Sequence, residues 1–528
     1  MSAPLYLRPR LEPPLRSLLD DGSFLHSLVD ALGSPLNVLL PESVAENLTR
    51  FRAVLGRHRL GGQVYYAHKA NRSSALVRRL AATDAGIDVA SLGELRHALE
   101  SGFTGDRIVA TGPKDEEFLW LAARCGATVS ADGPGELTTL ARLVRRFALP
   151  AVRVLLRLTD FPAPGVRILT HRSRFGTPAR DLGTLLDLLE RERDALTLTG
   201  LAYHLDTTSL AEKALALQGC VTALADCHAR GLYPDVIDVG GGFGVCYLAD
   251  GAEWERWTSA LTEAQLGAGP ALTWRGHGYG LRAEGGVLRG GLALYPAHRN
   301  PAGAAYLDAL LAHPAPGLGG PLASVLLDHL CRLYAEPGRA LLDQCGATLA
   351  RVVEVRRTPA GEHLVRLAMN AADASLEDHG ILVDPVLVSR EGPLLADGGE
   401  EGAASAAGVY LVGNLCLESD LITRRKVFLP RLPLPGELLC FANTAGYCMD
   451  FQAHDASRQP RAGKVAVFRS GGAWRWCLDE RYWPLAVPAG EPGATAQAAT
   501  RRTAKSQAAG VGRRARPVGT GPASERDA

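Results

Sequence analysis

Short apolar runs alternate with longer amphipathic segments from about residue 42 to residue 340. The runs have the length and composition of buried strands, and the segments between them carry apolar residues three and four positions apart, as amphipathic helices do. The predicted helices include Ser73–Ala82, Gly93–Glu100, Gly135–Phe147 and Glu212–Arg230. The predicted strands are Gln63–His68, Gly86–Ser91, Arg107–Thr111, Ala127–Ala131, Val152–Leu158, Leu198–Leu205, Val236–Val239 and Leu333–Glu336. Eight strands with helices between them predict an α/β fold, a (β/α)8 TIM barrel.

The connection between the seventh and eighth predicted strands is far longer than one helix and its loops require. It is rich in Gly, Pro, Trp and Tyr. We therefore expect an insertion at about residues 248–325, which forms either a lid or an oligomer contact.

The pattern changes after Arg339 to alternating strands with few helices, which predicts a separate β domain. Near the N-terminus, Pro35–Leu40 has the pattern of a strand that joins this domain. The expected strands of the domain itself are Thr348–Arg356, His363–Ala368, Gly408–Val412, Glu437–Asn443 and Ala462–Phe468.

Four regions follow from these patterns. They are an N-terminal segment joining the β domain over 1–41, a barrel over 42–340, a C-terminal β domain over 341–488 and a tail over 489–528. The tail is rich in Ala, Gly, Pro, Thr and Arg without an apolar period, and we expect it to be disordered.

The charge is nearly balanced, with 57 basic and 56 acidic residues and a net charge of +1. No overall field therefore attracts nucleic acid or membrane phosphate. The first residues have no apolar core between their charges, and no stretch approaches the roughly 18 apolar residues of a membrane span. The ten cysteines are scattered, without the C-x-x-C pairs of zinc or redox sites. We expect a cytoplasmic protein with reduced thiols, no metal, and no membrane or nucleic-acid partner.

Lysine is rare in this chain, which contains six lysines. Lys69 ends the first predicted strand, at the end where barrel enzymes place their active groups. A buried lysine there is costly unless its amine is neutral or covalently used, as in a Schiff base. Arginine has no nucleophilic amine and cannot substitute. Taken alone, a surface or ion-paired lysine remains the more common case.

Two motifs follow the seventh and eighth predicted strands. The run Gly240-Gly241-Gly242 lies where barrels often bind phosphate, because glycines let backbone N–H groups approach an anion. A plain turn is the alternative. Glu336-Pro337-Gly338-Arg339 offers a guanidinium for a phosphate and a carboxylate for a protonated ring nitrogen. A turn with a surface ion pair is the alternative there.

Three further positions carry candidate chemistry. His204 begins a polar cluster at the end of the sixth strand, where an imidazole could stack on a planar ligand and hydroxyls such as Thr207 could bind phosphate. Its alternative is a hydrogen-bonded core histidine. In the β domain, Cys416 and Asp420 share a short loop, and a tuned thiol can donate a proton. Tyr447 lies beside a glycine turn, and its alternative is an ordinary buried tyrosine.

Taken together and in this order, these motifs resemble the fold-type III pyridoxal-phosphate enzymes, and specifically the diaminopimelate, ornithine and arginine decarboxylase family. The resemblance covers about residues 35–467, with the insertion outside it. It implies an alanine-racemase-like (β/α)8 barrel followed by an antiparallel β-barrel or sandwich domain, with pyridoxal 5′-phosphate as the cofactor.

The resemblance also implies roles for single residues. Lys69, in Tyr66-Ala67-His68-Lys69-Ala70-Asn71, would carry the cofactor. His204 would stack on the pyridine ring, and Glu336 would pair with its nitrogen. Asp88 and the strand-five Arg157 would lie near the cofactor. The residues implied to hold the phosphate are Thr207, Gly240, Gly241, Gly242, Gly338, Arg339 and Tyr447.

In that family the active site forms across a homodimer, and one subunit supplies a catalytic thiol and a substrate-binding acid to the other. Cys416 and Asp420 match those two positions. Two residues depart from the pattern: Asp206 stands where the family has a small glycine in His-x-Gly-Ser, and Leu417 replaces the acid that accompanies dibasic and diamino substrates. The stretch after Asn370 aligns with no substrate-binding motif of the family.

The implied function is decarboxylation of a small amino acid through an external aldimine at Lys69, after which Cys416 would protonate the α-carbon. A pyridoxal-phosphate-dependent racemase is the enzymatic alternative. Glu336 favours decarboxylation, because racemases of this fold pair the ring nitrogen with arginine. The third hypothesis, a non-catalytic homologue that only binds the cofactor, is disfavoured by the presence of both Lys69 and Cys416.

Overall fold

The structure is a computed structural model that describes residues 4–161, 173–315, 317–395 and 405–484. Within them, parallel strands close into a ring in the order β5-β4-β3-β2-β12-β9-β8-β6, and β6 pairs with β5. The ring consists of β2 (Gly62–Ala67), β3 (Gly86–Val89), β4 (Ile108–Ala110), β5 (Thr128–Ala131), β6 (Val152–Thr159), β8 (Leu196–Ala202), β9 (Val236–Asp238) and β12 (Arg332–Ala335). The predicted TIM barrel is therefore confirmed, and every predicted strand overlaps an observed one.

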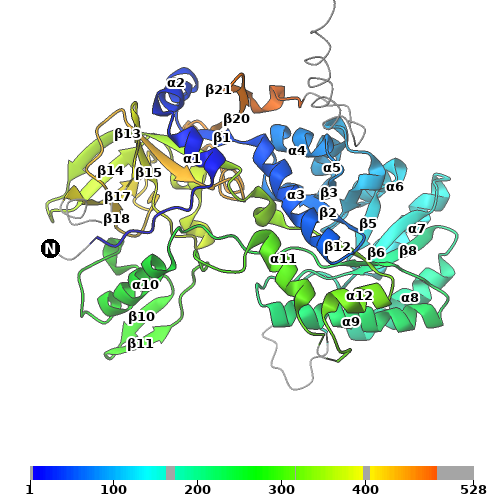
Figure 1. Ribbon diagram of the computed structural model, residues 1–528. Coiled ribbons are helices and arrows are strands. Elements are labelled where there is room, and N and C mark those ends of the chain that lie inside the picture. Colours follow the sequence, from blue (N-terminus) through cyan, green and yellow to red (C-terminus); the bar gives the residue numbers. More distant parts are fainter. Residues whose placement is uncertain (1–3, 162–172, 316, 396–404, 485–528) are drawn as a thin grey trace, which may run out of the picture. The chain divides into compact units, whose positions relative to one another are not determined.

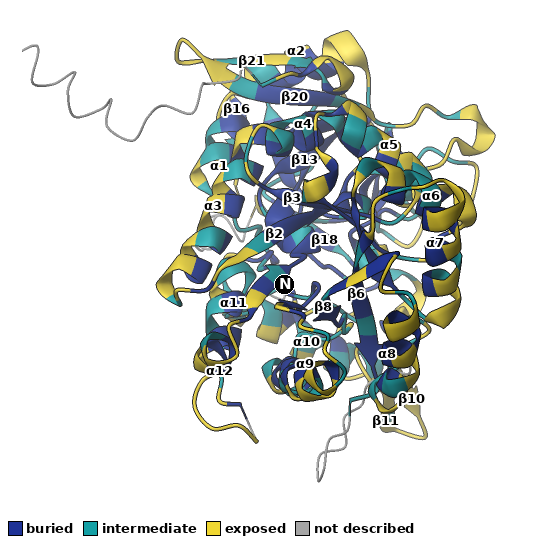
Figure 2. Cartoon of the chain, turned by 90° about the vertical axis from the view of Figure 1, so that its right-hand side faces the viewer, coloured by how far each residue is buried: buried dark blue, intermediate teal, exposed yellow. Residues whose placement is uncertain are grey.

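Amphipathic helices cover the ring from outside (Figure 1). Their starts follow from local chemistry: the Ser91 side chain accepts from Glu94 N, and the Asp115 side chain accepts from Phe118 N, which satisfies donors at the first turn. Figure 2 shows the barrel strands buried and the outward faces of these helices exposed. The helices are α3 (Pro41–Arg57), α4 (Ser74–Ala81), α5 (Leu92–Glu100), α6 (Glu116–Cys125), α7 (Pro134–Arg146), α8 (Leu182–Arg191) and α9 (Leu210–Ala229).

The chain between β9 and β12 has two parts. It first forms α10 (Gly251–Gln265) and the hairpin of β10 (Leu281–Glu284) and β11 (Val287–Gly290), and Tyr279 Oη donates to Glu377 of the β domain at 2.9 Å. It then forms α11 (Gly303–Ala312) and α12 (Leu322–Asp328), which contact α9 of the barrel. We therefore propose that the insertion itself covers residues 248–302, and we use the word in this sense below.

The β domain is built on one sheet with the order β16-β15-β19-β13-β1-β20-β21, to which β14, β17 and β18 are added beside β13. Its apolar face packs against the N-terminal helices α1 (Pro13–Leu19) and α2 (Gly22–Leu32). Its strands are β1 (Leu36–Leu39), β13 (Gly346–Arg357), β14 (His363–Leu367), β15 (Val386–Ser389), β16 (Gly392–Leu394), β17 (Ala407–Val412), β18 (Val427–Leu429), β19 (Leu438–Ala442), β20 (Gly463–Ser470) and β21 (Ala473–Leu478).

This sheet is mixed, whereas the family resemblance implied an antiparallel domain. β1 runs parallel to β20, and β14 runs parallel to β17. Neither pair is joined by a tight hairpin; a long connection separates the two strands in each case, and such a connection permits parallel pairing. The other pairings of the sheet are antiparallel.

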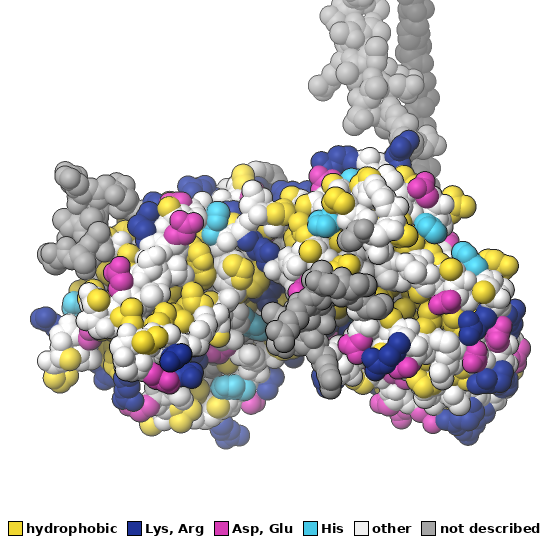
Figure 3. All heavy atoms as spheres, turned by 90° about the horizontal axis from the view of Figure 1, so that it is seen from below, with side chains coloured by type: hydrophobic (Ala, Val, Ile, Leu, Met, Phe, Trp, Pro, Cys, Tyr) yellow, Lys and Arg dark blue, Asp and Glu magenta, His cyan; other side chains and the backbone are white. Residues whose placement is uncertain are grey.

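No helix in the described ranges is long and apolar enough to cross a lipid bilayer. On the face shown in Figure 3, basic and acidic side chains are interspersed. The tail over 489–528, predicted to be disordered, lies outside the described residues.

Candidate active site

Lys69 lies in a single helical turn (His68–Ala70) that directly follows β2, at the carboxyl end of the barrel strands. Its Nζ is 3.7 Å from Oδ2 of Asp88, which lies on the neighbouring strand β3. Asp88 is buried; its Oδ1 accepts a hydrogen bond from the Thr111 hydroxyl, and its Oδ2 has no hydrogen-bond partner. The carboxylate of Asp88, with Glu336 adding to it, raises the pKa of Lys69 and keeps the free amine charged.

Glu336 directly follows β12. The sequence predicts His204 within the sixth strand, but β8 ends at Ala202, two residues before it. The two side chains meet, with His204 Nδ1 3.7 Å from Glu336 Oε2. Burial alone would raise the pKa of Glu336, but the neighbouring His204, Lys69 and Arg157 lower it. Burial lowers the pKa of His204. The outcome is a charged carboxylate beside a ring nitrogen at the floor of the site.

Asp238, which ends β9, is a buried carboxyl group to which the sequence assigned no role. Its Oδ1 accepts a hydrogen bond from Gly240 N at 2.9 Å. Burial, together with the charge of Glu336, raises the pKa of Asp238 well above its usual range. The opposite directions of the two pKa shifts favour the negative charge on Glu336 and the proton on Asp238.

The glycine loop after β9 leaves no room for side chains. A Cβ atom at Gly240 would lie 2.7 Å from His204 Nδ1, and one at Gly242 would lie 2.8 Å from Thr207 O; both glycines have positive φ. Gly338 also has a positive φ, and a Cβ there would lie 3.2 Å from the Tyr447 hydroxyl. The backbone can therefore line this end of the site directly, as anion binding by N–H groups requires.

Two cavities of about 510 Å³ and about 680 Å³ share Lys69, His204, Asp206, Thr207 and Glu336 in their walls. The first also contains Arg157, whose Nη1 is 3.6 Å from Asp132. The second extends over the glycine loop to Arg339 and Tyr447. The fold thus brings the predicted cofactor residues, separated by hundreds of positions in the chain, to one place.

Cys416 and Asp420 are not part of this arrangement in the same chain. Cys416 is exposed in the loop after β17 and lines neither of the two cavities. Asp420 is buried, and its two oxygens accept hydrogen bonds from Ala371 N and Leu415 N, both at 2.8 Å. The catalytic role of Cys416 and the substrate-binding role of Asp420 stay predictions.

Lys213 is a site residue that the sequence did not indicate. It lies in the first turn of α9, is fully buried, and donates from Nζ to the carbonyl of Gly241. Burial lowers its pKa to about 8, while Asp206 and Glu212 act in the opposite direction. A lysine in the first turn of a helix is typical of an exposed position, so no pattern in the sequence could have placed it under the glycine loop.

Comparison with known proteins identifies the family of this chain. The pyridoxal binding domain of the pyridoxal-dependent decarboxylases matches residues 42–267. The uncharacterized protein y4yA of Sinorhizobium fredii is 30% identical over 470 residues, which cover 87% of this chain and 94% of that protein. A diaminopimelate decarboxylase of Deinococcus radiodurans is 34% identical over 250 residues, which cover 44% of this chain and 60% of that protein. The chain belongs to the fold-type III pyridoxal-phosphate decarboxylase family.

A solved structure agrees with this family in fold. The diaminopimelate decarboxylase of M. jannaschii, crystallised with L-lysine, superposes with a TM-score of 0.64 at 17% identity and covers 86% of this chain and 91% of that one. The family places the chain among pyridoxal-phosphate-dependent decarboxylases, with pyridoxal phosphate as the cofactor.

The residues of the site fit this cofactor. Asp88 Oδ2 and Arg339 Nη1 are buried without a hydrogen-bond partner among the described residues. The glycine loop would be blocked by any Cβ, and a charged Glu336 lies where a basic ring nitrogen needs an acceptor. A ligand with an anionic group at one end and a basic ring at the other would pair with Arg339 and the glycine loop at one end and with Glu336 at the other.

The buried ammonium of Lys213 predicts a pH dependence of cofactor binding. Its pKa of about 8 means that the amine loses its proton as the pH rises through 8, and the phosphate then loses a nearby positive charge. Pyridoxal phosphate affinity should therefore be constant below pH 8 and fall above it, by about tenfold for each unit by which bound phosphate raises that pKa. Fluorescence titration of the apoprotein between pH 7 and about pH 10, where free lysine titrates, measures this.

Two controls separate this effect from other titrations. Pyridoxal, which lacks the phosphate, should show no such fall, and Lys213→Met should bind pyridoxal phosphate weakly with a flat profile. A profile of Lys213→Met that matches the wild type would contradict the assignment.

Proposed function

We propose that this protein is an amino-acid decarboxylase that works as a homodimer. The observation that carries the proposal is the meeting of Lys69, His204 and a charged Glu336 in the walls of the same cavities. Pyridoxal phosphate, when bound, withdraws electrons from the α-carbon of an amino acid attached to it. The bond from the α-carbon to the carboxyl group would then break, CO2 would leave, and a proton would take its place.

The chain's own residues would divide this work. Lys69 would hold the cofactor through its amine and give it up to the amine of the substrate. Glu336 would accept a hydrogen bond from the ring nitrogen and keep it protonated, which strengthens electron withdrawal. The glycines and Thr207 would fix the phosphate, so that the reacting bond is held in one orientation.

The dimer would supply a thiol as proton donor for the α-carbon, because the walls of the two cavities contain no cysteine among the described residues. Cys416 is exposed and outside both cavities of its own chain, as a residue that serves a partner's site would be. Cys416 of the partner subunit would protonate the α-carbon after CO2 has left. Leu417 beside it is 59% exposed and carries no charge, which disfavours substrates that end in an ammonium group.

The test is CO2 release from a panel of L- and D-amino acids, measured in D2O together with exchange of the α-proton. We expect CO2 from at least one amino acid, and an amine product that has gained one solvent deuterium at the α-carbon. Exchange of the α-proton without CO2 would replace the proposal with a racemase. Cofactor binding with neither reaction would leave a binding protein without this chemistry.

A further inference from the structure

The last part of the insertion is held against the glycine loop. Tyr247 N donates to Ala297 O at 2.7 Å, and Gly303 N donates to Gly244 O at 3.0 Å. The Tyr295 hydroxyl lies 2.6 Å from Val245 N. These bonds fix residues 295–303 beside the chain that leaves the phosphate end of the cavity.

Arg299 is the charged residue of this segment, and its guanidinium lies against Gly244. A Cβ atom at Gly244 would be 2.8 Å from both Nε and Nη1 of Arg299. These two nitrogens are buried and have no hydrogen-bond partner in the described residues. Arg299 lines the same cavity as Lys69 and Arg339. Arg299 therefore lines the active-site cavity and keeps two donors on its guanidinium that no described residue pairs.

Within the described ranges, Arg339 also has an unpaired guanidinium donor. Its Nη1 is also buried and unpartnered, and its guanidinium carbon lies 5.0 Å from the ring centre of Tyr295. The guanidinium carbon of Arg299 lies 6.0 Å from the centre of the same ring. Two positive groups are thus held near one tyrosine, with no carboxylate hydrogen-bonded to these nitrogens.

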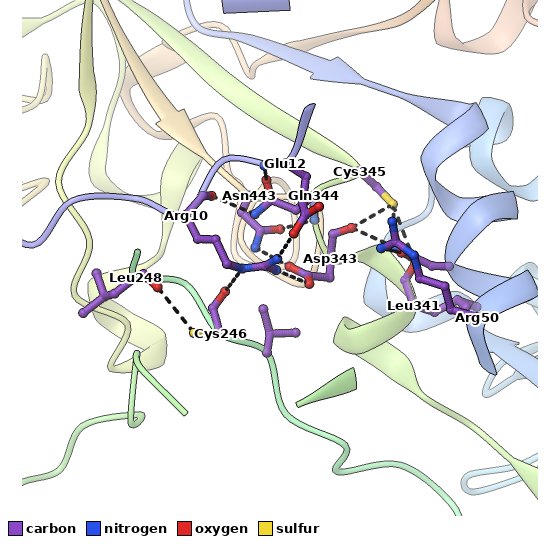
Figure 4. Close-up of polar contacts among 12 residues, drawn as sticks. Arg10, Glu12, Arg50, Cys246, Leu248, Leu341, Asp343, Gln344, Cys345 and Asn443 are labelled. Carbon is purple, nitrogen blue, oxygen red and sulfur yellow. Dashed lines mark hydrogen bonds and ion pairs between the residues drawn. The ribbon is translucent and has the colours of Figure 1, made fainter. Parts of the chain in front are cut away.

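The neighbouring Arg10 shows how a guanidinium is paired with carboxylates within this chain. Arg10 lines a third cavity, of about 320 Å³, that Arg299 also borders. Figure 4 shows the Arg10 guanidinium directed at Glu12, Asp343 and the carbonyl of Cys246, each within hydrogen-bond reach. Buried charge is costly unless it is paired and hydrogen-bonded. Arg10 meets this condition within the chain, whereas Arg299 and Arg339 need a partner from outside it.

We propose that Arg299 and Arg339 form a two-arginine site that binds one anionic oxygen group in the active-site cavity. The planar fork of donors on each arginine matches the oxygens of a phosphate or a carboxylate. The group is either the cofactor's phosphate or, resting on the proposed function, a second carboxylate on the side chain of the amino-acid substrate. In both cases the insertion supplies a binding residue that the motifs of the barrel do not include.

The test compares Arg299→Gln with the wild type in two assays. The first is fluorescence titration of the apoprotein with pyridoxal phosphate and with pyridoxal, which lacks the phosphate. The second is kcat/KM for CO2 release from glutamate against glutamine and from aspartate against asparagine. We expect a loss of about tenfold to a hundredfold in one assay, the range for hydrogen bonds to charged groups.

Each result has one meaning. Weaker binding of pyridoxal phosphate with unchanged pyridoxal assigns the site to the phosphate. Unchanged cofactor binding with a selective loss for the carboxylate substrates assigns it to the substrate. Equal effects on pyridoxal phosphate and pyridoxal, or no effect in either assay, would overturn the proposal. If the wild type decarboxylates no amino acid, the proposed function fails, and the titrations alone decide on the anion site.

Two further variants control for folding. Arg289→Gln changes an exposed arginine on β11 of the same insertion and should match the wild type in both assays. Arg299→Lys keeps the charge but loses the fork, and it should lose less than Arg299→Gln. Thermal unfolding of all three variants should stay close to that of the wild type.

Discussion

Lys69→Ala protein should purify without the visible absorbance of a covalently held cofactor, and its decarboxylation rate should fall by about 10²–10⁴-fold, the range that a positioned proton-transfer group contributes. The structure gives the reason, because Lys69 supplies the amine that reaches the floor of the cavity beside Asp88. Absorbance spectra and CO2 release measure the two effects. Lys426→Ala, which changes a lysine paired with Glu362 in the β domain, is the matched control and should keep both.

A mixed dimer extends this result to the proposed sharing of sites. One subunit carries Lys69→Ala and the other Cys416→Ala, and two different affinity tags isolate the mixed species. In a shared-site dimer, one of the two sites then has both wild-type groups, so about half of the wild-type activity should return. Two sites that are each complete within one subunit would leave the mixed dimer as inactive as its parents.

Glu336→Gln should retain the cofactor and lose about 10²–10³-fold in kcat. The substitution keeps the shape of the side chain and removes its charge, so the ring nitrogen loses the partner that keeps it protonated. The magnitude is that of removing one preorganised electrostatic partner from an active site. Single-turnover CO2 release on cofactor-loaded protein measures the chemical step apart from binding.

The neighbouring Asp238 provides the comparison. Burial and Glu336 raise the pKa of Asp238 well above its usual range, which favours the neutral form of this carboxyl group. Asp238→Asn should therefore cost far less than Glu336→Gln, although both side chains are buried in the same place. Equal losses in the two variants would show that packing, and not the charge of Glu336, matters at this position.

The sequence could predict what depends on local pattern. Each barrel strand is a short apolar run buried on both faces, and its end locates the residue that follows it, which is how Lys69 and Glu336 could be assigned to one rim. The strands β15, β16 and β18 are not predicted, because three or four residues are too few to show an alternating pattern. The strand β21 is not predicted either, although it pairs with β20 across the turn Gly471-Gly472, which is a hairpin signal in the sequence. The parallel pairing of β1 with β20 joins segments more than 400 positions apart, and no local pattern indicates it.

The site residues that escaped prediction are those with no motif around them. Lys213 looks like a surface lysine at the start of a helix, and only the fold buries it under Gly241. Arg299 lies 55 positions beyond Gly244 in the chain and meets it only through the backbone pairing of the insertion. Tertiary contacts between distant segments leave no periodic signal in the sequence.

In the sheet of the β domain, β1 lies between β13 and β20, so it cannot pair until the C-terminal part of the chain has been synthesised. Leu36 is paired with Leu349 on one side and with Gly463 on the other. At a synthesis rate of about 5–20 residues per second, the first of these partners is made roughly 15 to 60 seconds after β1, and the whole barrel emerges in between. During that time β1 is an apolar strand with two open edges, the kind of segment that nascent-chain chaperones protect. A fragment that starts at residue 341 would lack the strand that joins β13 to β20.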